Sequence, residues 1–320
     1  MVTNHVHSQQ KNSEKVEFRE RNHCIGCNSS NLIPLWQGKF SEEPTRSFIK
    51  RYHYSEDVVK LLGEEIFSLV RCENCGMTFH QRILSEKFLN LLYSTWINDV
   101  QIKKLEAEVR TISKIERLLQ IRKQSLKHLL RLHQHRKQFA SEEFRILDYG
   151  CGDGYFLVLA QLLGFDTYGI DFSSTRKQRA AQMGLNIFSS LENLKSQQAA
   201  KMHCVTLFQV LEHLDNPLLV LRKIVNIIEE GGILIVEVPN CKGITQPQNF
   251  SDFNNVNPLE HINTFTPATL KKICSQAGFV SMKRIPAHVT TRFIDVIRTE
   301  ISRFVQPSST SMYFRLCKSH

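Results

Sequence analysis

The segment Arg145-Ile-Leu-Asp-Tyr-Gly-Cys-Gly-Asp-Gly-Tyr-Phe-Leu157 decides the fold of this chain. Its first five residues predict a short buried strand, because an apolar run lies between a polar segment and a series of glycines. The glycines carry no Cβ, so they allow a tight turn and a close approach of the backbone to a ligand. From Tyr155 onward, apolar residues recur at helical spacing. The segment therefore predicts a strand, a glycine loop and a helix N-terminus, which is the nucleotide-binding geometry of α/β sheets.

Two acidic residues indicate which nucleotide binds there. The third glycine comes one residue earlier than in the dinucleotide fingerprint, and Asp148 at the strand end would repel a pyrophosphate. The same carboxylate suits a ligand with an ammonium and a sulfonium group, which is S-adenosylmethionine. Asp171 ends the next predicted strand, where an acidic side chain can accept both ribose hydroxyls. A glycine-rich turn without a ligand is the alternative, and the glycines together with both acids favour S-adenosylmethionine.

Four motifs in this order resemble those of class I S-adenosylmethionine-dependent methyltransferases. They are Leu147-Asp-Tyr-Gly-Cys-Gly-Asp-Gly154, Gly169-Ile-Asp-Phe172, Phe208-Gln-Val-Leu-Glu-His213 and Gly231-Gly-Ile-Leu-Ile-Val-Glu-Val-Pro239. The resemblance implies a donor site made of Asp148, Tyr149, Gly150, Cys151, Gly152, Gly154, Asp171, Phe172 and Gln209. It also implies that Glu212-His213 belongs to the architecture of that donor site.

The second half of the chain predicts an α/β fold, because strand and helix periods alternate from Phe144 onward. Strands are expected near 145–149, 166–171, 186–188, 204–209, 232–238 and 279–285, with an antiparallel strand over 312–316. Helices are expected at 155–163, 173–183, 217–229, 267–276 and 292–304. The expected fold is a doubly wound, mostly parallel, seven-stranded Rossmann-like methyltransferase sheet, preceded by a small zinc-ribbon-like domain and a helical linker.

Two C-x-x-C pairs, Cys24-Ile-Gly-Cys27 and Cys72-Glu-Asn-Cys75, predict a metal site in the first part of the chain. Each pair is followed by a residue that tolerates positive φ, Asn28 or Gly76, as a tight knuckle requires. Four thiolates suit tetrahedral zinc, and such a closed set is structural rather than catalytic. Two unrelated pairs or a redox dithiol are the alternatives. The arrangement resembles the zinc-binding domain that precedes some bacterial methyltransferases, of which sugar C-methyltransferases are the best-known examples.

Composition and charge define the remaining organisation of the 320 residues. No apolar run approaches the ~20 residues of a membrane helix, and the polar N-terminus has no secretory signal. Nine cysteines without an export signal favour a reducing, cytoplasmic location. Residues 101–140 carry eleven Lys or Arg against three Glu, on a basic helix that is either solvated or bound to phosphate. We expect a disordered lead (1–20), a zinc-binding domain (21–98), a basic helical linker (99–143) and a methyltransferase domain (144–320).

The candidates for catalysis are Glu260 and His261, which match a Glu-His pair that the sugar C-methyltransferases place at their acceptor site. His261 is a candidate general base because imidazole titrates near the operating pH, with Glu260 either as its orienting partner or as a ligand for acceptor hydroxyls. A purely structural role for His261 is the alternative. The sequence thus predicts a methyltransferase for a small-molecule or glycosidic acceptor. An RNA methyltransferase that holds nucleic acid with the zinc domain and basic helix is the second hypothesis, and a non-catalytic S-adenosylmethionine-fold binding protein is the third.

Overall fold

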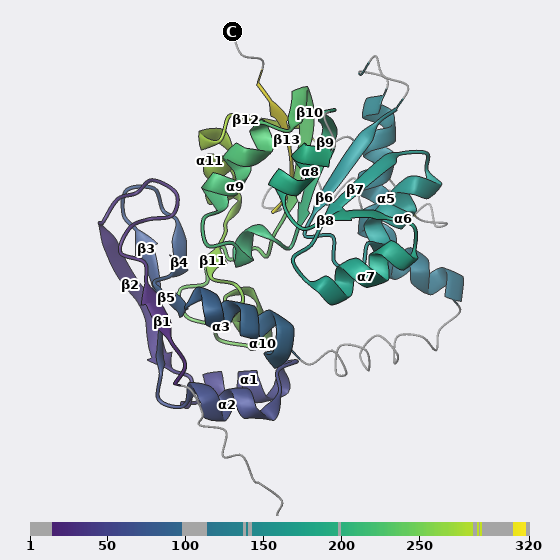
Figure 1. Cartoon of the computed structure of the whole chain (residues 1–320). Helices are drawn as coiled ribbons and strands as arrows, with labels where there is room; N and C mark the ends of the chain where they lie inside the picture. The colour runs from purple at the N-terminus through teal and green to yellow at the C-terminus, as the bar shows by residue number, and fades with distance from the viewer. Residues whose placement is uncertain are drawn as a thin grey trace, which may run out of the picture.

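The computed structural model describes residues 15–97, 114–136, 139, 143–197, 200–283, 287, 289 and 310–317. Within these residues, a catalytic sheet flanked by helices stands beside an N-terminal unit of strands and short helices (Figure 1). No helix in this described part of the chain combines the length and the apolar character that crossing a bilayer requires.

The catalytic sheet has seven strands in the order β12-β13-β10-β9-β6-β7-β8. Its strands are β6 (Arg145–Tyr149), β7 (Asp166–Ile170), β8 (Asn186–Phe188), β9 (Met202–Phe208), β10 (Ile228–Glu237), β12 (Phe279–Met282) and β13 (Ser311–Leu316). Neighbours from β10 to β8 pair in parallel, whereas β13 is antiparallel to both β10 and β12. The mixed, Rossmann-like methyltransferase sheet expected from the sequence is confirmed.

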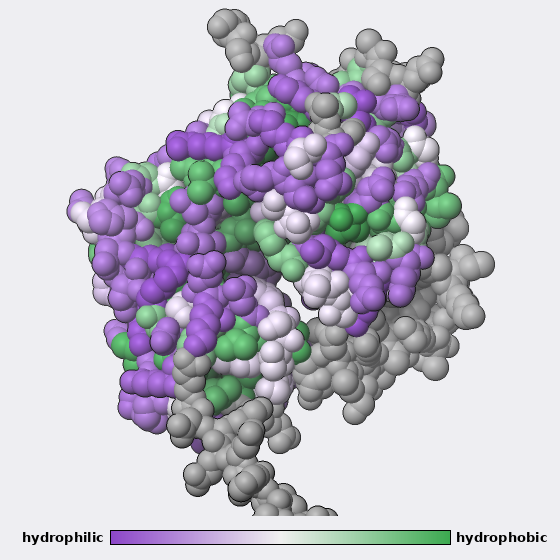
Figure 2. Space-filling view, in the orientation of Figure 1, coloured by the Kyte–Doolittle hydropathy of each residue, from purple (hydrophilic) through white to green (hydrophobic). Residues whose placement is uncertain are grey.

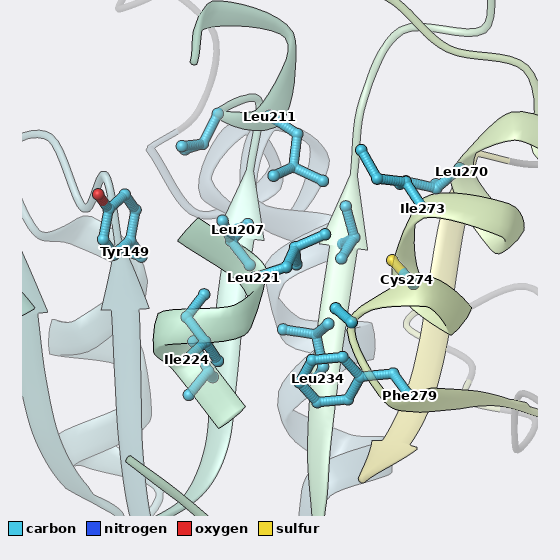
Figure 3. Packing of buried hydrophobic residues seen from close by; sticks show 14 of the residues in the cluster. Tyr149, Leu207, Leu211, Leu221, Ile224, Leu234, Leu270, Ile273, Cys274 and Phe279 are labelled. Carbon is cyan, nitrogen blue, oxygen red and sulfur yellow. The ribbon is translucent and has the colours of Figure 1, made fainter. Parts of the chain in front are cut away.

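Helices cover both faces of this sheet because its strands alternate their apolar side chains between two cores. In β10, Ile233 and Ile235 join the core under one face, and Leu234 and Val236 join the core under the other. The first face is covered by α5 (Lys114–Arg136), α6 (Tyr155–Leu162) and α7 (Ser174–Gln182), and the second by α8 (Leu191–Gln197), α9 (Pro217–Val225) and α11 (Pro267–Gln276). Figure 3 shows side chains of α9 and α11 packed on Leu207 and Leu234 of the sheet.

Some predicted boundaries were wrong. The helix expected over 217–229 ends at Val225, because Ile228 pairs with Met202 and begins β10 before an irregularity in the ladder. Helix α8 and the short helix α10 (Phe250–Asn255) were not predicted. The helix expected over 292–304 lies outside the described residues, as do residues 1–14 of the expected disordered lead. Residues 18–20 of that lead form β1, which pairs with β5 (Arg82–Leu84), so tertiary pairing overrides their polar composition.

The basic stretch expected to be a linker contributes directly to the catalytic core. The last part of α5 buries Leu129 and Leu132 against the layer that contains α6. Arg131 is also buried, with its guanidinium over the ring of Tyr313 in β13. In its described C-terminal part, the basic helix is therefore packed against the catalytic sheet. The remainder of the predicted linker, apart from 114–136, 139 and 143, is outside the described residues.

The N-terminal unit is built on three antiparallel strands, β2 (Leu32–Lys39), β3 (Ile66–Cys72) and β4 (Thr78–His80). Its helices are α1 (Thr45–Arg51), α2 (Glu56–Leu62) and α3 (Glu86–Leu91), followed by a π-helical turn over Leu92–Trp96. The aromatic residues of the long insert between the cysteine pairs form a core with α10 of the catalytic part. The rings of Phe48 and Phe253, for example, stack with centroids 5.4 Å apart.

A buried segment, residues 256–265, joins the two parts of the molecule. Its strand β11 (Asn263–Thr264) pairs with β4 and becomes the fourth strand of the N-terminal sheet. The guanidinium of buried Arg21 donates to the carbonyl oxygens of His80 and Ile262, and to Oδ1 of Asn263 at 2.9 Å. Asn263 in turn donates to the carbonyl oxygens of Leu211 and Leu214. Buried hydrogen bonds thus hold the segment to both parts at once.

We predict that Arg21→Met destabilises the protein by about 3 kcal/mol or more, because several buried acceptors lose a charged donor together. Arg19→Met is the matched control: Arg19 also reaches the catalytic part, through Asp215 at 2.6 Å, but this pair is exposed. An exposed ion pair contributes about 0–1 kcal/mol. Urea denaturation of both variants measures the difference. Equal stability losses would contradict the role given to Arg21.

Candidate donor and acceptor sites

The glycine loop after β6 is shaped by contacts that leave no room for side chains. Gly150 has φ of +79°, its N–H donates to the carbonyl oxygen of Ile170 at 2.7 Å, and a Cβ there would lie 2.5 Å from Val210. Gly154 has φ of +78°, and its Cβ would lie 2.2 Å from Leu185. Because both positions combine positive φ with a close neighbour, the loop conformation requires glycine at each.

Asp171 lies directly after β7 and faces this loop. Its two carboxylate oxygens accept hydrogen bonds from the main-chain N–H groups of Gly152, at 3.0 Å, and Ser173, at 2.8 Å. A carboxylate has about four acceptor positions, so both oxygens can still accept the hydroxyls of a ribose. The next residue, Phe172, exposes 66% of its surface and offers an apolar ring beside that position.

Asp148 is buried at the end of β6, where it accepts a hydrogen bond from Thr206 Oγ1 at 2.6 Å. Burial raises the pKa of Asp148 to about 7, and the neighbouring Asp171 acts in the same direction. A cationic group near Asp148 would reverse part of this shift, because an opposite charge favours the ionised carboxylate. The site is therefore suited to a positively charged ligand.

The other predicted donor residues lie around the same loop. Tyr149 and Cys151 are buried, and the Tyr149 ring meets Phe172 edge to face at 6.1 Å. Gln209 follows β9 with φ of +56°, and its N–H donates to the carbonyl oxygen of Glu237. The structure thus brings all nine residues of the predicted donor site to the carboxyl ends of adjacent parallel strands, where α/β sheets bind ligands.

A second polar cluster, the Glu212–His213–His261 cluster, lies beside the donor loop. One ligand atom of each side chain lies within 4.8 Å of the other two. Glu212 is 1% exposed, and its oxygens accept no hydrogen bond from another described residue, so burial raises its pKa to about 8. His213 Nδ1 donates to the carbonyl oxygen of Glu260 at 2.9 Å, and His261 Nδ1 donates to that of Asn255 at 3.2 Å. Both assignments follow because a carbonyl oxygen can only accept.

Glu260 and His261, which were expected to act together, take different hydrogen-bond partners in the structure. The Glu260 carboxylate accepts hydrogen bonds from the Tyr54 hydroxyl and from His53 Nε2, both of the N-terminal unit. Burial alone would raise the pKa of Glu260, but the bond to His53 and the charge of that ring, with Tyr54, lower it. His261 is oriented by Asn255 instead, because adjacent residues in the turn point in different directions. Glu260 therefore connects the acceptor side to the N-terminal unit.

The contact of Tyr54 and His53 with Glu260 had no signal in the sequence, although Tyr54 belongs to an aromatic insert expected to form a small core or a substrate-facing wall. Both residues lie about two hundred residues from Glu260 along the chain, in a helix-to-helix connection without a recognisable motif. Asn257 supports the same contact by donating from Nδ2 to the Tyr54 hydroxyl oxygen at 2.8 Å. The Glu212 carboxylate was interpreted only as donor-site architecture. Its lack of partners could not be read from the sequence, because it depends on which side chains surround it.

The four cysteines of the two C-x-x-C pairs come together as expected. Cys24 Sγ lies 3.4 Å from Cys75 Sγ, and Cys27 Sγ lies 3.6 Å from Cys72 Sγ. Each knuckle closes with the expected positive φ, +59° at Asn28 and +76° at Gly76. The four sulfur atoms lie within 4.8 Å of one another, which is a donor set that could hold one metal ion. This cluster packs against the same apolar core as α9 and α11.

Comparison with known proteins gives the family. The sequence profile of a methyltransferase-domain family matches residues 104–282, more than half of the chain, and the chain belongs to this family. The match to a methyltransferase domain agrees with the donor loop and sheet that the sequence had indicated.

Two curated relatives are ubiquinone biosynthesis O-methyltransferases. The one from Caulobacter sp. (strain K31) is 33% identical over 131 residues, which cover 39% of this chain and 51% of the relative. The one from Xanthomonas axonopodis pv. citri (strain 306) is 27% identical over 103 residues, which cover 30% and 43%. The chain spans about half the length of the curated relatives it matches.

Two of the solved structures similar to this chain are methyltransferases. The plantazolicin methyltransferase BpumL in complex with SAH aligns with a TM-score of 0.47 at 14% identity, covering 72% of this chain and 94% of that one. A SAM-dependent methyltransferase from Archaeoglobus fulgidus aligns with a TM-score of 0.36 at 22% identity, covering 59% and 92%.

We predict that Asp171→Ala weakens binding of S-adenosylhomocysteine by roughly 10- to 100-fold, because a charge-assisted acceptor for the ribose is lost. Asp166→Ala is the matched control, since Asp166 begins the same strand at its opposite end. Titration calorimetry on folded protein measures both. An Asp171→Ala variant that binds like the control would remove Asp171 from the donor site.

Proposed function

We propose that this methyltransferase acts on a small-molecule or glycosidic acceptor, with an oxygen atom as the methylated group. The observation that carries the proposal is the contact of Tyr54 and His53 with Glu260, because it places the N-terminal unit beside the Glu212–His213–His261 cluster. Figure 2 shows a hollow in the surface where the N-terminal unit meets the catalytic domain. An acceptor side bordered by two parts of the chain suits a compact substrate. The names of the relatives support an oxygen acceptor.

In this proposal the donor is held by the nine predicted residues at the glycine loop. Asp171 accepts the ribose hydroxyls, the exposed ring of Phe172 covers the adenine, and Asp148 faces the cationic end of the donor. The loop glycines and Gln209 contribute main-chain contacts. The transfer is an in-line displacement, so positioning of donor and acceptor supplies most of the acceleration.

His261 is our first candidate for taking the proton of the acceptor. Its Nδ1 donates to Asn255, which leaves the lone pair on Nε2 within the cluster beside the donor loop. A hydroxyl acceptor must lose its proton during methyl transfer, and an imidazole so oriented can receive it. Glu260 supports the acceptor side through Tyr54 and His53 rather than through His261.

The proposal is tested by methyl transfer from labelled S-adenosylmethionine to panels of phenols, glycosides and structured RNA at two salt concentrations. We expect transfer to a small hydroxylated compound, with little change of KM between the two salt concentrations. Methylation of RNA with a steep loss of affinity at high salt would instead favour the nucleic-acid hypothesis, because phosphate contacts release counterions. Folded protein that binds no donor would support the non-catalytic alternative.

We further propose that Cys24, Cys27, Cys72 and Cys75 hold one structural zinc ion. Their four sulfur atoms lie within 4.8 Å of one another, and four thiolates would complete the tetrahedral coordination of zinc and leave no open position. The ion would cross-link the turn before β2 to the turn between β3 and β4. The N-terminal unit would then depend on zinc for its stability.

We predict that Cys72→Ser lowers the zinc content by one ion per chain and lowers the melting temperature, because a ligand and the cross-link are lost. Cys317→Ser, at an exposed cysteine, is the control. Elemental analysis and thermal unfolding provide the two readouts. An unchanged zinc content in Cys72→Ser would exclude this assignment.

A further inference from the structure

We propose that Glu212, His213 and His261 form a second metal site, which binds a divalent first-row transition ion at the acceptor side of the donor. This inference rests on the proposed function for its catalytic consequence, but ion binding itself does not. The three residues come from the turn after β9 and from the buried segment 256–265, so only the folded chain assembles them.

The Glu212 carboxylate is the strongest sign of a ligand. It is 1% exposed, and neither oxygen accepts a hydrogen bond from another described residue. Buried polar atoms in native proteins nearly always have partners, and an orphan one calls for an ion, a water molecule or a functional reason. A cation between Glu212 and the two histidines would satisfy both the charge and the lone pairs of this carboxylate.

Both imidazoles are oriented as metal ligands usually are. Each Nδ1 donates to a main-chain carbonyl oxygen, of Glu260 for His213 and of Asn255 for His261. Such bonds fix the tautomer and leave the lone pair on Nε2, the atom that binds the metal. His213 Nε2 already lies 4.0 Å from Glu212 Oε1. The His213 side chain is 24% exposed, so an ion and an acceptor can reach the cluster from solvent.

The spacing fits an ion after a small adjustment. Ligands that share one ion at about 2.1 Å lie up to ~4.2 Å apart, and the three ligand atoms here lie within 4.8 Å of one another. Two imidazole nitrogens and one carboxylate suit zinc, iron, cobalt or nickel better than magnesium or calcium. Three protein ligands also leave coordination positions open, unlike the four-cysteine cluster.

The open coordination positions would let the acceptor bind the ion directly, which defines the role of the ion in the reaction. An acceptor hydroxyl that binds the ion through its oxygen loses its proton to water more readily, because the cation stabilises the oxyanion. That oxygen then forms the new C–O bond as the C–S bond of the donor breaks, and the sulfur keeps the electron pair. His261 would act here as a ligand, and the ion would replace it as the group that promotes proton loss.

Zinc counting tests the site without any assay of activity. Untagged protein is dialysed against buffered zinc and analysed for bound metal. We expect two zinc ions per chain in wild type and in the surface control His133→Gln, but one in Glu212→Gln and in His261→Gln. Glu212→Gln should melt no lower than metal-stripped wild type, because the buried carboxylate it replaces has no partner there. The proposal is overturned if Glu212→Gln and wild type bind the same number of ions.

Failure of this inference can be separated from failure of the proposed function. Once an acceptor has been identified, a mild chelator that leaves the cysteine-bound zinc in place should abolish turnover in wild type. Added zinc or cobalt should restore it. Glu212→Gln should not regain turnover with added metal, whereas the surface control His133→Gln should regain it. A turnover rate that the chelator leaves unchanged would overturn the proposed role of the ion. Absence of donor binding in wild type would overturn the proposed function, whereas the zinc count would still decide the site.

Discussion

Buried main-chain groups between the two parts of the molecule must all find hydrogen-bond partners, and the rest of the structure depends on how they do so. Residues 256–265 are buried throughout and carry both Glu260 and His261. Their partners come from both sides: β4 pairs with β11, Arg21 donates to Ile262, and Asn263 donates to the turn that contains Glu212. One set of hydrogen bonds therefore positions Glu260 and His261 relative to the turn that contains Glu212. A change in this interface would move the candidate site as well as loosen the N-terminal unit.

The donor side is organised by a different kind of constraint, in which backbone geometry and charge act together. Gly150 and Gly154 adopt conformations and close approaches that a side chain would prevent. Asp171 uses main-chain N–H groups of the loop and of the next helix to hold its carboxylate in place. Asp148 is buried with a raised pKa, so its ionised form is most stable when a cation arrives. A loop of this kind is organised before the ligand binds, which keeps the cost of ordering it low.

The two polar clusters differ in what holds their side chains together. The four cysteines sit on two tight knuckles, each closed by a positive φ at Asn28 or Gly76, and the short sulfur–sulfur contacts run between the two knuckles. The Glu212–His213–His261 cluster has no such local device. His261 reaches the other two residues only because the buried segment crosses the end of β9. The His213 ring is oriented by the carbonyl oxygen of Glu260 in that segment, and the His261 ring by that of Asn255 at the end of α10. The four-cysteine cluster would cross-link two turns of the N-terminal unit. The Glu212–His213–His261 cluster opens toward the proposed acceptor.

The sequence by itself determined the α/β class, strands β6 to β8, the glycine loop, the positions of Asp148 and Asp171 at strand ends, and the tight turn of each cysteine knuckle. These features depend on residues that are close along the chain, where periodicity, missing Cβ atoms and positive φ act directly. Only the tertiary structure decided that Glu260 meets Tyr54 and His53 instead of His261, that Ile228 begins a strand, and that buried Glu212 has no hydrogen-bond partner among the described residues. Each of these outcomes depends on which distant segment fills the neighbouring space. Local sequence carries little information about such contacts, because their energy arises only when the segments pack together.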